Sequence, residues 1–121
     1  MRAAIAASIF VLATPAFADE CLKYDQPATL TGYVGDAVFP GQPNYADVKK
    51  GDAKETASLL FLASPICTDG DGDYDGVAVV PVVQLICPGL KSSAGSPVTV
   101  KGTVIPAQTA HHHAAVLLDC Q

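Results

Sequence analysis

The chain has 121 residues, of which 50% are hydrophobic, and a formal net charge of −5. Residues 1–18 hold 14 of the hydrophobic residues and one charge, Arg2, so the other 103 residues are about 45% hydrophobic with a net charge of −6. This composition is typical of one soluble globular domain. It excludes two large domains and a polytopic membrane protein, and its acidity disfavours nucleic-acid binding because phosphates are repelled.

The first segment, residues 1–18, is typical of a secretory signal peptide. Arg2 supplies a positive start, an apolar run follows, and Ala16-Phe17-Ala18 fits a signal peptidase site. The run is too short to span a bilayer comfortably as a membrane anchor. We expect cleavage after Ala18 and a single exported domain, residues 19–121, in the bacterial periplasm or outside the cell, with no membrane insertion after cleavage.

The remaining chain is predicted to be all-β. Short alternating or apolar segments are separated by loops rich in Gly, Pro and Asp. A long loop is expected from about Gly35 to Glu55, and Pro81 inside the third strand predicts a bulge or a locally unpaired edge. The predicted strands are Thr29–Val34, Ala57–Ala63, Val77–Ile86, Val98–Ile105 and Ala114–Asp119.

An internal echo favours a closed fold. Residues 27–34 resemble residues 97–104, with Gly32 and Gly102 in the middle of each strand on the expected inner face. A mid-strand glycine marks a sharp bend or a close backbone approach. Two bent strands among five favour a small five-stranded OB-like barrel, and the alternative is a small open β-sandwich.

All four cysteines lie in residues 19–121: Cys21, Cys67, Cys87 and Cys120. An even number in an oxidising compartment implies two disulfides, and the absence of a C-x-x-C pair disfavours zinc. In the barrel topology a 67–87 bridge would have to span about 33 Å, which is beyond disulfide reach. The first and second strands are expected to be antiparallel, which brings Cys21 near Cys67. The third and fifth strands are expected to pair in parallel, which brings Cys87 near Cys120. The predicted disulfides are therefore Cys21–Cys67 and Cys87–Cys120.

The segment Thr109-Ala110-His111-His112-His113 is the most unusual part of the sequence. In an extended chain His111 and His113 point to one side and His112 to the other. Two imidazoles on one face can bind copper or zinc, although no third ligand is adjacent in sequence. The alternatives are a structural role, in which the rings tie down the loop before the last strand, and another binding role.

An acidic turn resembles the opening of a calcium loop, with D-x-D-x-D-G at Asp71, Asp73, Asp75 and Gly76. The twelfth position should carry a bidentate Glu but is Val82. We therefore favour a solvated acidic hairpin turn over a calcium site.

Motifs for catalysis are missing, since there is no G-x-S-x-G, H-E-x-x-H or phosphate loop and no free cysteine is expected. An enzyme is not expected. A candidate binding patch comprises Tyr33, Phe39, Tyr45 and His112. These aromatic residues could equally pack under the long loop.

The sequence resembles a family of small exported bacterial proteins with a C-terminal domain of unknown function that carries a T-x-H-H-H motif. The resemblance implies that the histidines are native, that Cys21 and Cys67 belong together, and that Cys87 and Cys120 are additions. It implies no activity. At position 110 this sequence has Ala where members of the family often have Gly. The residues that carry it are 21–24, 40–45, Gly51-Asp52, 65–67, 98–103, 109–113 and 116–118.

The function expected from the sequence is that of an exported, non-enzymatic binding or accessory domain acting on a protein or cell-envelope partner. The alternative is a periplasmic protein that binds copper or zinc through His111 and His113. No other cofactor is expected.

Overall fold

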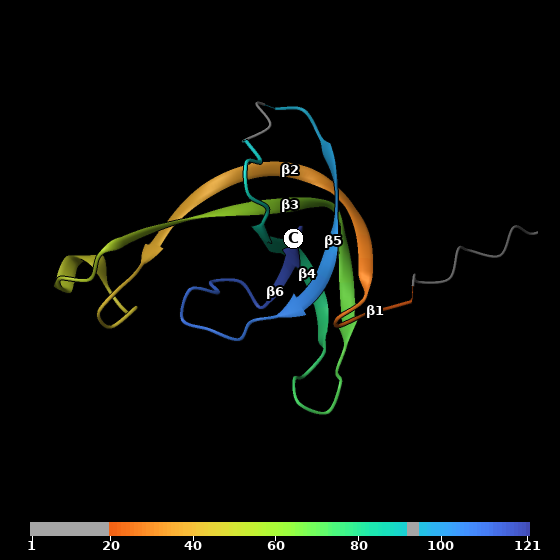
Figure 1. Ribbon diagram of the computed structural model, residues 1–121, viewed down its shortest axis with the longest axis horizontal. Helices are drawn as coiled ribbons and strands as arrows, with labels where there is room; N and C mark the ends of the chain where they lie inside the picture. The colour runs from red at the N-terminus through yellow and green to blue at the C-terminus, as the bar shows by residue number, and fades with distance from the viewer. Residues whose placement is uncertain (1–19, 92–94) are drawn as a thin grey trace, which may run out of the picture.

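The computed structural model describes residues 20–91 and 95–121, so the predicted signal peptide lies outside the described residues. The described residues form an all-β structure, as predicted (Figure 1). Its elements are β1 (Leu22–Lys23), β2 (Pro27–Pro40), the 3-10 turn η1 (Val48–Lys50), β3 (Lys54–Asp69), β4 (Val77–Ile86), β5 (Val98–Pro106) and β6 (Val116–Asp119). Within these ranges no helix is long and apolar enough to cross a membrane.

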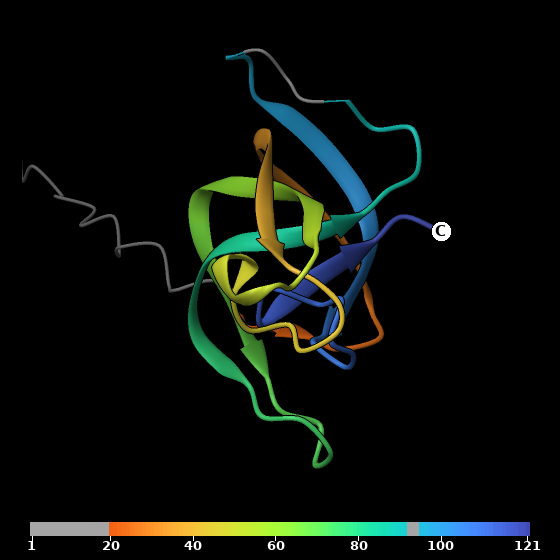
Figure 2. The same ribbon diagram turned by 90° about the vertical axis from the view of Figure 1, so that its left-hand side faces the viewer.

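Five of the strands pair in a ring. β2 pairs antiparallel with β3 and β5, β3 pairs antiparallel with β4, β4 pairs parallel with β6, and β6 pairs antiparallel with β5. These five elements are the five predicted strands, and they curl around a common interior (Figure 2). The remaining strand, β1, was not predicted. It pairs in parallel with Thr68 and Asp69 at the end of β3, beyond the part of β3 that pairs with β2.

The predicted long loop from Gly35 to Glu55 is wrong. β2 continues to Pro40 and pairs in continuous register with β3, which begins at Lys54, so the connection shrinks to residues 41–53. Cross-strand pairing outweighs the local Gly, Asp and Pro signals that suggested a loop.

The prediction at Pro81 is confirmed. The register between β3 and β4 shifts from the pair Phe61–Val82 to the pair Ile66–Val80, so β3 bulges opposite Pro81. Because proline lacks a backbone N–H, it occupies the one position of β4 that the bulge leaves without a paired residue on β3.

The two mid-strand glycines lie at close backbone approaches, as predicted. Gly32 is the residue at which β2 passes from pairing with β5 to pairing with β3, since it is in register with both Val98 and Leu62. A Cβ atom at Gly32 would collide with the Phe61 carbonyl group, and one at Gly102 would lie 2.6 Å from the Asp119 carbonyl oxygen. Only glycine therefore fits at either position.

The interior is small and is reinforced by two disulfides. The largest fully buried side chains among the described residues are Leu60, Leu117, Leu118, Val83, Val104 and Val116. The disulfides join Cys21 to Cys67 and Cys87 to Cys120, with Cα–Cα distances of 4.6 and 4.8 Å, and these are the pairs that the strand order predicts. Two disulfides indicate an oxidising environment.

The close approach at Gly32 yields a stability prediction. Gly32→Ala should lower the free energy of unfolding by about 1–3 kcal/mol, because the new methyl group meets a backbone carbonyl that cannot move away without breaking strand pairing. Gly35→Ala is the matched control on the same strand, since its Cβ would meet only the tip of the flexible Phe61 ring at 3.2 Å. Urea unfolding measures both variants, and equal losses would contradict the account.

Candidate functional site

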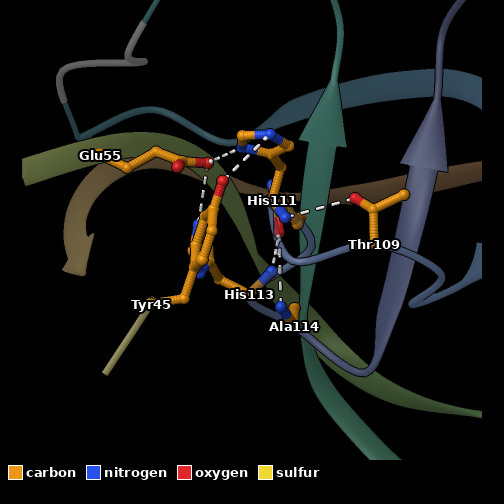
Figure 3. A network of polar contacts seen from close by, with 7 residues as sticks. Tyr45, Glu55, Thr109, His111, His113 and Ala114 are labelled. Atoms are coloured by element: carbon orange, nitrogen blue, oxygen red, sulfur yellow. Dashed lines mark hydrogen bonds and ion pairs between the residues drawn. The ribbon is translucent and has the colours of Figure 1, made fainter. Parts of the chain in front are cut away.

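Two loops that are far apart in sequence meet beside the start of β3. Residues 41–53 connect β2 to β3, and residues 107–115 connect β5 to β6. Glu55, in register with Phe39 of β2, lies at their junction and points toward the histidine loop (Figure 3).

The Glu55 carboxylate contacts two imidazoles through one oxygen. Oε1 lies 2.9 Å from Nδ1 of His111 and 3.1 Å from Nε2 of His113. The hydrogen bonds to His111 and then His113 hold the pKa of Glu55 below its usual range, so the carboxyl group is ionised at neutral pH. Because an ionised carboxylate only accepts hydrogen bonds, both ring nitrogens must carry a proton.

This arrangement fixes the tautomer of His111. With the proton on Nδ1, Nε2 of the neutral ring is an acceptor, and the Tyr45 hydroxyl lies 3.4 Å from it. The two rings also meet edge to face, with centroids 5.4 Å apart. The His111 side chain remains 59% exposed, so this end of the cluster faces solvent.

His113 is the buried member of the cluster. Its ring stacks on Phe39 with centroids 4.5 Å apart, and its side chain is only 9% exposed. Its backbone N–H donates to Oε1 of the buried Gln84 at 2.6 Å, while Nε2 of Gln84 donates to the His111 carbonyl at 3.1 Å. One amide side chain from β4 therefore holds the backbone of the histidine loop on both sides of residue 112.

His112 makes a hydrogen bond within its own loop. The Gln108 backbone N–H donates to Nδ1 of His112 at 2.9 Å. Burial lowers the pKa of His112, and a positive charge on His111 or His113, present only when that ring is doubly protonated, lowers it further. A neutral ring preserves this bond because a proton on Nδ1 would remove the acceptor. His111 and His113 both contact Glu55, whereas His112 contacts Gln108.

The 41–53 loop is organised by Asp52. Its buried carboxylate accepts hydrogen bonds from three backbone N–H groups, those of Asn44, Ala46 and Asp47, at 2.8–2.9 Å. These bonds, with that of Asp47 the largest contribution, hold the pKa of Asp52 below its usual range. The carboxylate thus shapes the turn that carries Tyr45, whose φ of 51° lies in the left-handed region.

The expected binding patch does not form as one surface. Phe39 and Tyr45 join the histidine cluster, whereas His112 faces Gln108. Tyr33 lies six residues before Phe39 on β2, about 20 Å along the strand, and is paired with Phe61. Local sequence patterns could not show that the extended β2 carries Tyr33 away from the cluster.

Two residues of the site were missed by sequence reasoning: Glu55 and Gln84. Glu55 stood at the edge of a supposed loop, and no pattern linked it to histidines more than 50 residues later. Gln84 did carry a signal, since it is the one polar side chain in the otherwise apolar segment Val77–Ile86.

The acidic turn is closed by hydrogen bonds to the side chain of Asp71. Oδ1 of Asp71 accepts the backbone N–H groups of Asp73 and Tyr74 at 3.0 and 2.8 Å, which closes the turn, and Val82 lies within β4. Across residues 20–91 and 95–121 no group of three or more His, Cys, Asp or Glu side chains could hold a metal ion. In the His111–Glu55–His113 cluster the three side chains are joined by hydrogen bonds.

The fold and the cluster define a disulfide-bonded, all-β domain with a loop-built polar and aromatic surface. Residues 83–121 match the sequence profile of a family described as a domain of unknown function (DUF4431). The matched segment contains Gln84, the histidine loop and the Cys87–Cys120 disulfide, but neither Glu55 nor Tyr45. No curated protein and no solved structure matches the chain.

The Asp52 carboxylate yields a prediction on pH dependence. Its pKa is depressed in the folded protein, so its contribution to stability is fully present above the pKa of the unfolded chain and is lost as the pH falls through the folded-state pKa. Asp52→Asn should lower Tm at neutral pH and flatten the acid limb of the pH–stability profile. Melting curves between neutral and acidic pH measure both effects.

The isosteric control is Asp25→Asn. Asp25 is exposed and has a positive φ that Asn also tolerates. The assignment would be wrong if Asp52→Asn and Asp25→Asn gave the same profile.

Proposed function

We propose that this protein is an exported, non-enzymatic binding domain that engages a protein or cell-envelope partner through the loops 41–53 and 107–115. The observation that carries the proposal is the shared Glu55 carboxylate. It fastens His111 and His113 beside Phe39 and Tyr45 while leaving His111 largely exposed. Side chains that are ordered before a partner arrives lose less conformational entropy on binding.

We also propose that the ring of strands is an OB-like barrel. When the five strands of the ring are numbered in chain order, the first (β2) pairs with the second (β3) and the fourth (β5), and the third (β4) pairs in parallel with the fifth (β6). This order supports the OB-like topology over an open β-sandwich, which would leave one pairing unmade. OB folds bind ligands between the loop joining strands 1 and 2 and the loop joining strands 4 and 5. By fold-level analogy these are residues 41–53 and 107–115.

Site-specific photo-crosslinking in the intact organism tests the binding surface. A photoreactive residue at position 110, which is exposed in the histidine loop, should give a discrete adduct. The same residue at position 101, exposed on β5, should not. Glu55→Gln should weaken the adduct at position 110, because an uncharged amide oxygen accepts hydrogen bonds from the two ring N–H groups more weakly than an ionised carboxylate does.

The same bands from positions 110 and 101, or an adduct at position 110 that is unaffected by Glu55→Gln, would contradict the proposed surface. Absence of any adduct at position 110 would also count against it.

A second candidate function is binding of copper or zinc by His111 and His113. It is favoured by the convergence of their ring nitrogens on one carboxylate oxygen. A metal would have to replace these hydrogen bonds and complete its coordination with water or with a repositioned Glu55. Copper or zinc should then raise Tm of the untagged protein, and the rise should disappear in the His111→Ala/His113→Ala variant. An unchanged Tm with both metals would remove this candidate.

A further inference from the structure

A second surface, which shares no residue with the histidine cluster, lies where β1 and the start of β2 meet the β3–β4 hairpin. Here a concave pocket of about 520 Å³ has a mainly apolar lining. The apolar residues around it are Leu22, Leu30, Pro65, Ile66, Ala78 and Val79. Val79 is 65% exposed, so its side chain is available to a ligand that approaches the pocket.

The same hairpin ends in a strongly acidic tip. Asp69, Asp71, Asp73 and Asp75 are all exposed, and the chain has no Lys or Arg between Lys54 and Lys91. Lys23, in register with Asp69, offsets one of these charges. The local charge is therefore negative, which attracts cations and repels phosphates and anionic lipids.

The pocket and the tip are continuous. Thr68 and Val77 form the last pair of the hairpin, the tip lies beyond them, and the next residues back, Cys67 and Ala78, line the pocket. Tyr24 braces this junction, because its hydroxyl donates to the Asp75 carbonyl at 2.8 Å and lies 3.0 Å from the Thr68 hydroxyl oxygen. The acidic tip therefore has a fixed relation to the apolar pocket.

We propose that this pocket and the acidic tip together bind a cationic, amphipathic peptide segment of a protein partner. An apolar side chain of the segment occupies the pocket, and its Lys or Arg side chains face Asp73 and Asp75. Removing the apolar surfaces of the pocket and the peptide from water supplies affinity. The acidic tip attracts a positively charged peptide as it approaches and disfavours a negatively charged one. The occupant follows from charge complementarity, because an anionic or neutral apolar ligand would gain nothing from the tip.

Fluorescence anisotropy with labelled synthetic peptides tests the proposal on the disulfide-bonded protein. A peptide of alternating Lys and Leu should bind, and its affinity should fall as salt rises. Peptides of the same length with Glu in place of Lys, or Ser in place of Leu, should bind at least about tenfold more weakly.

Paired variants separate the two contributions. Val79→Ser should weaken binding of the Lys–Leu peptide about five- to tenfold. The control Val38→Ser changes a valine that is 59% exposed near the end of β2, away from the pocket, and should leave binding unchanged. Asp73→Asn/Asp75→Asn should weaken binding and reduce its salt dependence. The control Asp36→Asn/Asp119→Asn removes the same charge far from the tip and should leave binding unchanged.

Several results would overturn the proposal. They are no binding of the Lys–Leu peptide, equal binding of the Glu–Leu peptide, and binding that is indifferent to Val79→Ser or to Asp73→Asn/Asp75→Asn. Dependence on Val79 without dependence on charge would assign the pocket to a neutral apolar ligand instead.

Discussion

The close approach of β2 to its two neighbours at Gly32 is the constraint on which the rest of the structure depends. At this residue β2 leaves β5 and continues along β3, so one long strand belongs to both sides of the ring. The absence of a side chain lets β2 lie against the Phe61 carbonyl. β2 then arches across the molecule (Figure 1), and near its end Phe39 stacks on His113 of the histidine loop.

The site is then assembled by polar groups that each perform more than one task. Glu55 accepts from two imidazoles, Gln84 both donates to and accepts from the histidine loop, and Asp52 accepts three backbone N–H groups. Each group satisfies backbone or ring donors that a loop would otherwise present to water. These hydrogen bonds give the loops 41–53 and 107–115 a defined conformation, although neither loop contains a regular element longer than η1.

Local sequence patterns predicted some parts of the structure, whereas parts that depend on contacts between distant residues were missed. Alternation of side chains located β5 and the core part of β2, and the extended apolar run located β4, because these patterns are local. Strand order then excluded a 67–87 bridge and gave both disulfides. The second part of β2 and the first two residues of β3 were mistaken for loop, because only cross-strand pairing stabilises Gly35, Asp36 and Pro40 in a strand. The contacts of Glu55 with His111 and His113 depend on that same non-local register.

The central claim is that one ionised carboxylate, that of Glu55, accepts two hydrogen bonds, one from a protonated ring nitrogen of each imidazole. Long-range ¹H–¹⁵N NMR of the histidine rings, recorded where the imidazoles are neutral, tests it most directly. The account predicts that His111 is protonated on Nδ1, His113 on Nε2, and that Glu55→Gln changes both signals. A His111 ring protonated on Nε2, or rings that average freely between tautomers, would contradict it.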